Sequence, residues 1–218
     1  DQLKAQAREE RSLGFGNPEN NEREARSREE LGIQILRSCF EQDPILHSAL
    51  STAMSARIAQ EQYRAEAVAF ELFQNADDAY LESGSDQGIF CAEFSRNVFR
   101  FAHWGRPIND PATDDPEVAH SQKRDLVKML VLHGSDKGGG AANGRPTGKF
   151  GLGFKSVFLL TDTPSIVSRD LAVRICCGFF PVKLESDNRA ELAGWLTSVR
   201  PNMKEGTAVQ LPLRNGTD

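Results

Sequence analysis

The hydrophobic and polar positions of the chain separate into helical and strand patterns. The clearest helical pattern runs over residues 70–80, where four polar residues recur at i, i+3, i+4 and i+7 and share one face: Glu71, Gln74, Asn75 and Asp78. Apolar or small residues repeat this spacing on a second face, which can pack on a core: Ala69, Leu72, Phe73 and Ala76. The polar face carries no lysine or arginine. It therefore suits a metal ion and a water nucleophile, although an ordinary amphipathic helix shows the same pattern.

The rest of the chain shows strand patterns and further helical patterns. Residues 89–94 and 98–103 predict a hairpin, and residues 165–168, 172–180 and 207–213 predict further strands. Asp115 precedes Pro116 as a helix start, and Asp187 is expected to cap a short helix. The apolar residues of that helix are expected to face inward: Leu192, Trp195 and Leu196. Helical patterns also cover residues 29–40, 44–58 and 157–160.

Composition places these elements in a globular chain with a charged extension. The 218 residues are 39% hydrophobic and 26% charged, which is typical of a soluble protein. Residues 1–31 are rich in Glu and Arg, so we expect a charged helical N-terminal extension over residues 1–62 and a main domain over residues 63–218. The net charge of −5 disfavours a nucleic-acid partner.

Cysteine usage and hydropathy favour an intracellular protein without a membrane partner. The four cysteines form no CxxC pair and no metal-binding spacing, and the adjacent Cys176 and Cys177 fit strand packing better than redox chemistry. No signal peptide is evident, and no apolar run approaches the roughly 20 residues of a membrane span. The chain begins without Met and ends abruptly, so we expect it to be part of a longer polypeptide.

Residues 133–154 form a long stretch that contains eight glycines. A loop of this kind within a compact domain is typical of a functional lid or of a disordered segment. Its end leads directly into the helix expected at 157–160, so backbone N–H groups of Gly148, Gly151 and Gly153 can converge on an anion. A flexible linker with a helix cap is the alternative. The stretch matches neither a Walker loop nor a Rossmann motif.

Four motifs occur together in one order: ELFQNADDA (71–79), GKFGLGFKSVF (148–158), TDTPSIVS (161–168) and GTAV (206–209). Together they resemble the GHKL ATPase superfamily of gyrase, heat-shock chaperones, histidine kinases and MutL, and its sacsin-like branch in particular. The resemblance covers residues 65–214. It implies an α+β two-layer Bergerat fold, in which helices cover one face of a mixed, mostly antiparallel sheet. ATP would lie between helices and a lid at about residues 134–147.

The resemblance also implies a role for individual residues. Glu71 resembles the general base that orients the attacking water, and Asn75 resembles the amide that holds Mg²⁺ against the phosphates. Asp78 is expected to shape the nucleotide pocket, and Thr207 resembles the strand residue that takes part in adenine recognition. These roles agree with the chemistry, because a carboxylate accepts protons and an amide oxygen is a hard, uncharged ligand.

The end of the glycine-rich stretch supplies the remaining phosphate contacts that the resemblance implies. The phosphate-facing turn is matched by Gly148, Gly151, Gly153 and Phe154, and Lys149 from the same turn joins the expected nucleotide-binding residues. Relatives often take a cationic transition-state group from a following domain. Within this chain the candidates are Lys137, Arg145 and Lys149, for which a solvated loop charge is the simpler interpretation.

One motif departs from the family. The second family signature is commonly DxGxG, whose Asp takes the adenine amino group, whereas this chain has HWGRP from residue 103 onward. His103 and Gly105 are therefore the expected nucleotide-binding residues at this position. A neutral imidazole can accept one hydrogen bond, and Trp104 either stacks or packs. The carboxylate that usually recognises adenine is missing.

These features predict an Mg²⁺-dependent, slowly hydrolysing ATP-binding domain of a larger sacsin-like, chaperone-type protein. Its expected partners are ATP and ADP, the remaining domains of that protein, and client proteins or a second copy. One alternative is an inactive nucleotide-sensing or interaction scaffold. Another is a DNA-handling ATPase like MutL, which the acidic balance disfavours. A histidine kinase is disfavoured because no phospho-acceptor helix is evident.

Overall fold

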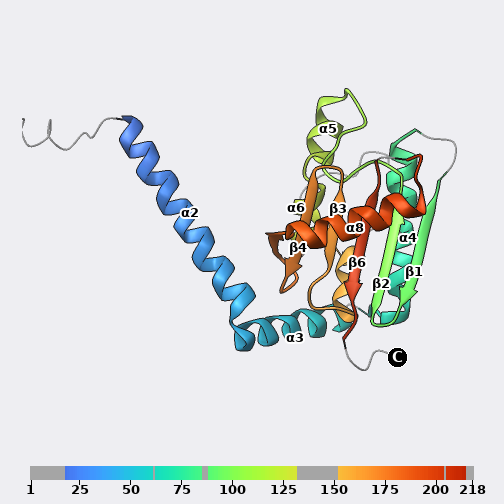
Figure 1. Cartoon of the computed structure of the whole chain (residues 1–218), viewed down its shortest axis with the longest axis horizontal. Coiled ribbons are helices and arrows are strands. Elements are labelled where there is room, and N and C mark those ends of the chain that lie inside the picture. The colour runs from blue at the N-terminus through green and yellow to red at the C-terminus, as the bar shows by residue number, and fades with distance from the viewer. Residues whose placement is uncertain (1–17, 61, 85–87, 132–151, 204, 215–218) are drawn as a thin grey trace, which may run out of the picture. The chain divides into compact units, whose positions relative to one another are not determined.

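The computed structural model describes residues 18–60, 62–84, 88–131, 152–203 and 205–214 (Figure 1). The chain divides into two compact units, residues 1–43 and residues 44–218. In the first unit the described residues form a single helix, α2 (Pro18–Gln42), which is longer than the helical pattern at residues 29–40. The second unit begins with α3 (Pro44–Gln60) and therefore starts earlier than the ATP-binding domain expected from residue 63. The limits of that domain stay a prediction.

The second unit combines helices with one sheet. After α3, its helices are η1 (Ala65–Ala67), α4 (Val68–Glu82), α5 (Pro116–Gln122), α6 (Asp125–Leu130), α7 (Leu152–Lys155), η2 (Ser156–Leu159) and α8 (Ser186–Val199), of which η1 and η2 are 3₁₀ helices. Its strands are β1 (Phe90–Ser95), β2 (Val98–His103), β3 (Ser165–Ser168), β4 (Leu171–Cys176), β5 (Phe180–Lys183) and β6 (Thr207–Pro212). The α+β class predicted from the sequence is thus confirmed.

The six strands form an antiparallel sheet in the order β1-β2-β6-β3-β4-β5. β6 lies in the centre, where Val209 pairs with Phe101 of β2 on one side and with Ile166 of β3 on the other. The expected hairpin and C-terminal strand are confirmed. Every strand pair of the described residues is antiparallel, whereas a mixed sheet was expected. The tight turns at Arg96 and Arg169, both with positive φ, reverse the chain directly between neighbouring strands.

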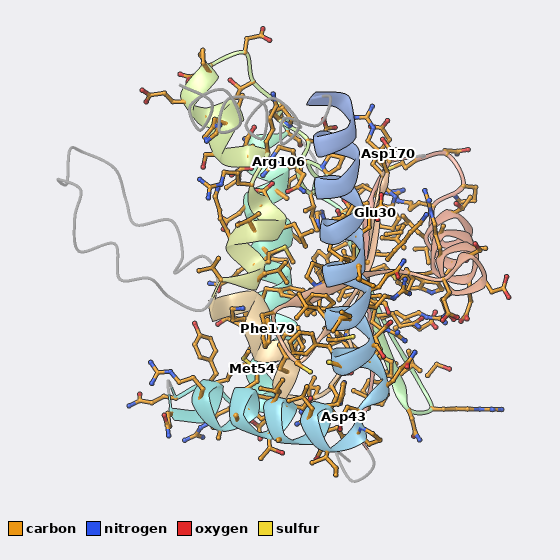
Figure 2. All side chains as sticks on the ribbon, turned by 90° about the vertical axis from the view of Figure 1, so that its left-hand side faces the viewer. Glu30, Asp43, Met54, Arg106, Asp170 and Phe179 are labelled. Carbon is orange, nitrogen blue, oxygen red and sulfur yellow. The ribbon has the colours of Figure 1, made fainter. Side chains whose placement is uncertain are left out.

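Residues 172–180 do not form the single strand that was expected. β4 ends at Cys176, and the chain turns at Cys177 (φ 54°) and Gly178 (φ 83°) into the separate strand β5. Two successive positive φ angles are incompatible with a continuing strand. A Cβ at Gly178 would also lie 2.2 Å from Cε of Met54 in α3, and Figure 2 shows Met54 beside this turn.

Helices cover both faces of the sheet. The first core joins α3, α4, α7 and η2 to one face and includes Leu72, Ala76, Phe101, Ile166 and Val209. The second core joins α8 to the other face and includes Ala102, Ala208, Leu192, Trp195 and Leu196 (Figure 1). The inward-facing residues predicted for α8 are confirmed, although its N-cap is Glu185 and not Asp187. These residues are buried against the second face of the sheet. The helix α8 is therefore an additional layer, whereas helices on only one face of the sheet were expected.

Candidate functional site

One face of α4 forms a wall of a large cavity. The cavity has a volume of about 820 Å³ and is lined by residues of α4, α5, α6, α7, β2 and β6. Glu71, Asn75 and Asp78 all line it and are partly exposed. Gln74 also lines the cavity, so the structure brings together all four residues that the helical spacing placed on one face.

The core-facing side of α4 differs by one residue from the expected one. Its buried residues are Val68, Leu72 and Ala76, which repeat at i, i+4 and i+8 on a neighbouring face. Ala69 is exposed, so its expected place in the core is wrong. Phe73 is half-buried and packs edge-on against Phe90 of β1, with ring centroids 4.8 Å apart. These contacts fix the rotation of α4 and so direct its polar face into the cavity.

Glu71 lies against the start of α7. A Cβ at Gly153 would be 2.6 Å from Oε2 of Glu71, so the carboxylate would have to shift if this position carried a side chain. Partial burial raises the pKa of the Glu71 carboxyl above its ordinary value. A raised pKa makes the carboxylate a stronger base at neutral pH. The expected general base thus lies beside Gly153, one of the expected phosphate-facing residues.

The sheet forms the floor of the cavity through His103 and Thr207. These two residues lie opposite each other on β2 and β6, are both buried, and both line the cavity. Oγ1 of Thr207 lies 2.7 Å from Oγ of Ser168. The Ser168 hydroxyl also accepts a hydrogen bond of 2.9 Å from the backbone N–H of Ile108. Ser168 was not predicted as a site residue, because only the strand order places it beside Thr207.

The imidazole of His103 is neutral. Burial, together with the charge of Arg106, lowers the pKa of His103 from 6.5 to about 4. Its Nδ1 accepts a hydrogen bond of 3.3 Å from the backbone N–H of Gly105. Gly105 in turn packs directly on α4, because a Cβ there would lie 2.6 Å from the backbone nitrogen of Tyr80. The turn after β2 is therefore held against α4 by its backbone.

Trp104 points to the other side of the sheet. It belongs to the core beneath α8 and does not line the cavity. Gly206 allows this packing, since a Cβ there would lie 2.9 Å from the Trp104 ring. The Arg200 guanidinium lies 6.0 Å from the ring centroid, a cation–π contact. Of the two roles that the sequence left open for Trp104, the structure shows packing.

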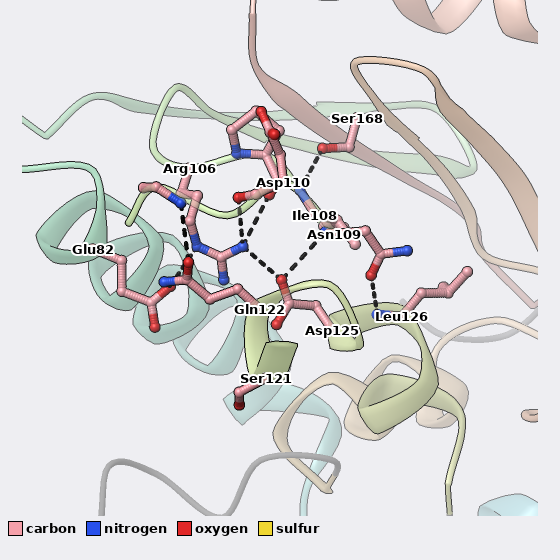
Figure 3. A network of polar contacts seen from close by, with 12 residues as sticks. Glu82, Arg106, Ile108, Asn109, Asp110, Ser121, Gln122, Asp125, Leu126 and Ser168 are labelled. Carbon is pink, nitrogen blue, oxygen red and sulfur yellow. Dashed lines mark hydrogen bonds and ion pairs between the residues drawn. The ribbon is translucent and has the colours of Figure 1, made fainter. Parts of the chain in front are cut away.

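Arg106 forms an extensive polar network at the cavity (Figure 3). Its Nε donates to Glu82 at 2.6 Å and its Nη1 donates to Asp125 at 2.7 Å. Nη1 also donates to the carbonyl oxygens of Pro107 and Asp110, at 3.2 and 3.1 Å. This side chain is 8% exposed and joins the C-terminal end of α4 to the start of α6. Sequence reasoning missed it because the two carboxylates lie 24 and 19 residues away in the chain.

Asn109 extends this network to the first turn of α6. Its φ of 64° is a conformation that Asn tolerates better than most residues. Its Oδ1 accepts from the backbone N–H of Leu126 at 2.9 Å, and its own N–H donates to Asp125 at 3.2 Å. A residue distant in sequence therefore caps α6, and the wall opposite α4 is fixed in place.

Lys155 is a buried cation that the sequence analysis did not single out. Its side chain has no exposed surface, and Nζ donates to the carbonyl oxygens of Leu130 at 2.8 Å and Gly178 at 3.3 Å. Desolvation lowers the pKa of Lys155 from 10.5 to about 8. Phe154 beside it is buried in the first core and also lines the cavity, so its aromatic ring contributes packing.

Several expected site residues lie outside the described residues. They are Gly148, Lys149 and Gly151 of the glycine-rich turn, together with the expected lid at residues 134–147 and its cations Lys137 and Arg145. Within the described part of the chain, Arg106 and Lys128 are cations that line the cavity. Arg106 is held by two carboxylates, and Lys128 is held by Ser121 at 2.7 Å.

The donor set of the cavity fits a nucleotide-bound Mg²⁺. Among the described residues, no group of three or more His, Cys, Asp or Glu side chains is arranged to hold a metal ion. Mg²⁺ that is bound to phosphates does not need such a cluster, because it keeps several water ligands and takes only one or two oxygen ligands from the protein. The side-chain oxygen of Asn75 in the cavity is a suitable ligand of this kind.

The fold and cavity define an α+β domain whose acidic, amide-bearing helix faces an antiparallel sheet. The family model of the Sacsin domain matches residues 52–177, more than half of the chain, and the chain belongs to this family. The matched range runs from α3 to the turn after β4 and includes Glu71, Asn75, His103 and Gly153. No curated protein matches the chain. The helices of the described residues are too short or too polar to cross a bilayer.

Proposed function

We propose that this chain is a nucleotide-binding domain of the GHKL type that binds ATP with Mg²⁺ and hydrolyses it slowly. The observation that carries the proposal is the position of Glu71 and Asn75, one turn apart on α4 and both lining the cavity of about 820 Å³. Cavities of about 300–1,000 Å³ are typical of small-molecule and cofactor sites. The approach of Glu71 to Gly153 supports phosphate binding near the carboxylate.

In this proposal Glu71 is the general base and accepts the proton of the attacking water. Its raised pKa supports the role, because a base works best when its pKa lies closer to the working pH. Asn75 holds Mg²⁺, which when bound neutralises phosphate charge. The backbone at Gly153 contacts the phosphates, and the sheet floor at His103 and Thr207 contacts the base.

The domain acts as part of a larger sacsin-like, chaperone-type protein. Nucleotide binding and release change its conformation and signal to the remaining domains, and through them to client proteins or to a second copy. Membership of the Sacsin domain family supports this setting. The neutral His103 in place of a carboxylate favours a second candidate, a scaffold that binds nucleotide without turning it over.

The proposal is tested by calorimetric titration of the chain with ATP and ADP, with and without Mg²⁺, followed by a phosphate-release assay. Asn75→Ala should weaken Mg²⁺-dependent binding at least tenfold, whereas Asn188→Ala, an exposed asparagine on α8, should leave it unchanged. Glu71→Ala should retain binding and abolish turnover. Glu66→Ala, which removes an exposed carboxylate outside the cavity, is its matched control.

The outcomes separate the two candidates. Binding with a turnover that depends on Glu71 supports the ATPase. Binding without turnover, in the unmodified chain as in Glu71→Ala, supports the scaffold. Absence of binding by any nucleotide contradicts both.

A further inference from the structure

Two linked hydrogen bonds determine what Thr207 offers to the cavity. The Ser168 hydroxyl accepts the N–H of Ile108 and lies 2.7 Å from the Thr207 hydroxyl. Ser168 is 1% exposed, so its own hydrogen needs a protein acceptor, and Oγ1 of Thr207 lies within reach. The opposite direction would leave the Ser168 hydrogen buried without a partner, at the full desolvation cost. Either hydroxyl can be the donor of this contact; with Ser168 as the donor, the Thr207 hydrogen is available to the cavity that Thr207 lines.

His103 presents a second donor from the neighbouring strand. Because Nδ1 of the neutral ring accepts the Gly105 N–H, the ring proton resides on Nε2. Within the described residues Nε2 donates to no side chain or carbonyl, and it is not among the fully buried atoms that lack a partner. Since His103 lines the cavity, this N–H faces it. His103 and Thr207 are cross-strand partners, so the two donors lie side by side.

We propose that His103 and Thr207 read the base through its hydrogen-bond acceptors, so that a 6-oxopurine such as guanine or hypoxanthine binds at least as tightly as adenine. This inference rests on the proposed function and specifies the substrate class of the same cavity. The 6-oxo oxygen accepts both donors. The 6-amino group of adenine is itself a donor and leaves one or both donors without a partner. Sites that fix their hydrogen-bond polarity in this way discriminate strongly against the mismatched group.

The helix α4 contributes an acceptor that fits the same base. Asp78 lines the same cavity, and its carboxylate is an acceptor. A 6-oxopurine carries a ring N–H next to its oxygen, and guanine adds an amino group, so such a base has donors for Asp78 and an acceptor for the floor. Asp78 can also favour adenine, by accepting from its amino group. The test therefore includes it.

The first measurement compares the affinities of the unmodified chain for ATP, GTP and ITP in the presence of Mg²⁺, by calorimetry. GTP and ITP are expected to bind with dissociation constants equal to or below that of ATP. ITP separates the 6-oxo oxygen from the 2-amino group of guanine. A tenfold or greater preference for ATP over both overturns the inference while leaving the proposed function intact. If no nucleotide binds, the proposed function fails and the inference fails with it.

Variants then test whether His103 and Thr207 cause the preference between the purine bases. His103→Asp replaces a donor by an acceptor and should shift the ratio of affinities at least tenfold toward ATP, whereas His120→Asp on the exposed side of α5 should leave it unchanged. Thr207→Val removes the second donor at nearly constant volume and should weaken GTP and ITP more than ATP. It keeps the inference testable if a buried aspartate prevents folding. An unchanged ratio in folded variants, or a preference for ATP that disappears in Asp78→Asn, would contradict the role of the floor.

Discussion

The buried ammonium of Lys155 leads to a quantitative prediction about stability and pH. Its pKa is about 8 in the folded chain, against 10.5 for an ordinary lysine. Between these two values the unfolded chain binds more protons than the folded chain, so stability rises with pH through this range. The difference of about 2.5 between the two pKa values corresponds to about 3 kcal/mol in total. About 1 kcal/mol of this increase falls between about pH 7 and pH 9.

The perturbation is Lys155→Met, which keeps most of the volume and removes the charge. The variant loses two charged hydrogen bonds, to Leu130 and Gly178, each worth about 1.5–3 kcal/mol. It also removes a desolvation cost of similar size, so the sign of the change at a single pH decides nothing. The dependence on pH is the informative quantity. The stability of the unmodified chain minus that of the variant should rise by about 1 kcal/mol from about pH 7 to pH 9.

Urea unfolding at several pH values measures this difference. Cys177 acts in the opposite direction, because burial raises the pKa of its thiol from 9.0 to about 11 and favours the unfolded chain as the pH rises. Both proteins contain Cys177, so its contribution cancels in the comparison. Lys183→Met removes an exposed lysine from β5 and controls for the loss of one charge. Parallel stability curves for the unmodified chain and Lys155→Met would refute the reasoning.

Three further predictions concern the cavity walls. Phosphate release should fall as the pH is lowered through the raised pKa of Glu71, because the protonated carboxyl cannot accept a proton. The pH profile of kcat measures this effect. If the residual activity of Glu71→Gln still falls at acid pH in the same way, Glu71 is not the general base. Gly105→Ala should lower the free energy of unfolding by about 1–3 kcal/mol, measured by urea unfolding, because its Cβ meets the α4 backbone. Gly194→Ala in α8 has open space around it and should raise the free energy of unfolding by up to about 1 kcal/mol. Arg106→Met should cost about 3 kcal/mol in the same assay, because it leaves the carboxylates of Glu82 and Asp125 unpaired.

The sequence predicted those features that depend on local spacing. The hairpin over β1 and β2, the cap at Asp115 and the polar face of α4 all follow from residues a few positions apart, and the structure confirms them. The contacts of His103 and Thr207, the Arg106 network and the burial of Lys155 depend on segments that are distant in the sequence. The Ser168 hydroxyl, for example, accepts from the N–H of Ile108 and contacts a strand that begins at Thr207. The periodicity of the sequence does not show which strands become neighbours, so these features could be seen only in the folded structure.

The two ends of the cavity differ in how they are held. At the floor, Gly105 packs on the α4 backbone, and the N–H of Arg106 donates to the carbonyl oxygen of Ala79 at 2.8 Å. The His103 ring is in turn oriented by the Gly105 N–H. Helix, turn and imidazole are therefore connected, and a change at Gly105 is expected to move His103 together with α4. At the other end, Glu71 lies against Gly153 at the start of α7. In the proposed function, a shift of α7 alone would change the surroundings of the Glu71 carboxylate without moving His103 and Thr207, so turnover and base binding are expected to respond separately to substitution.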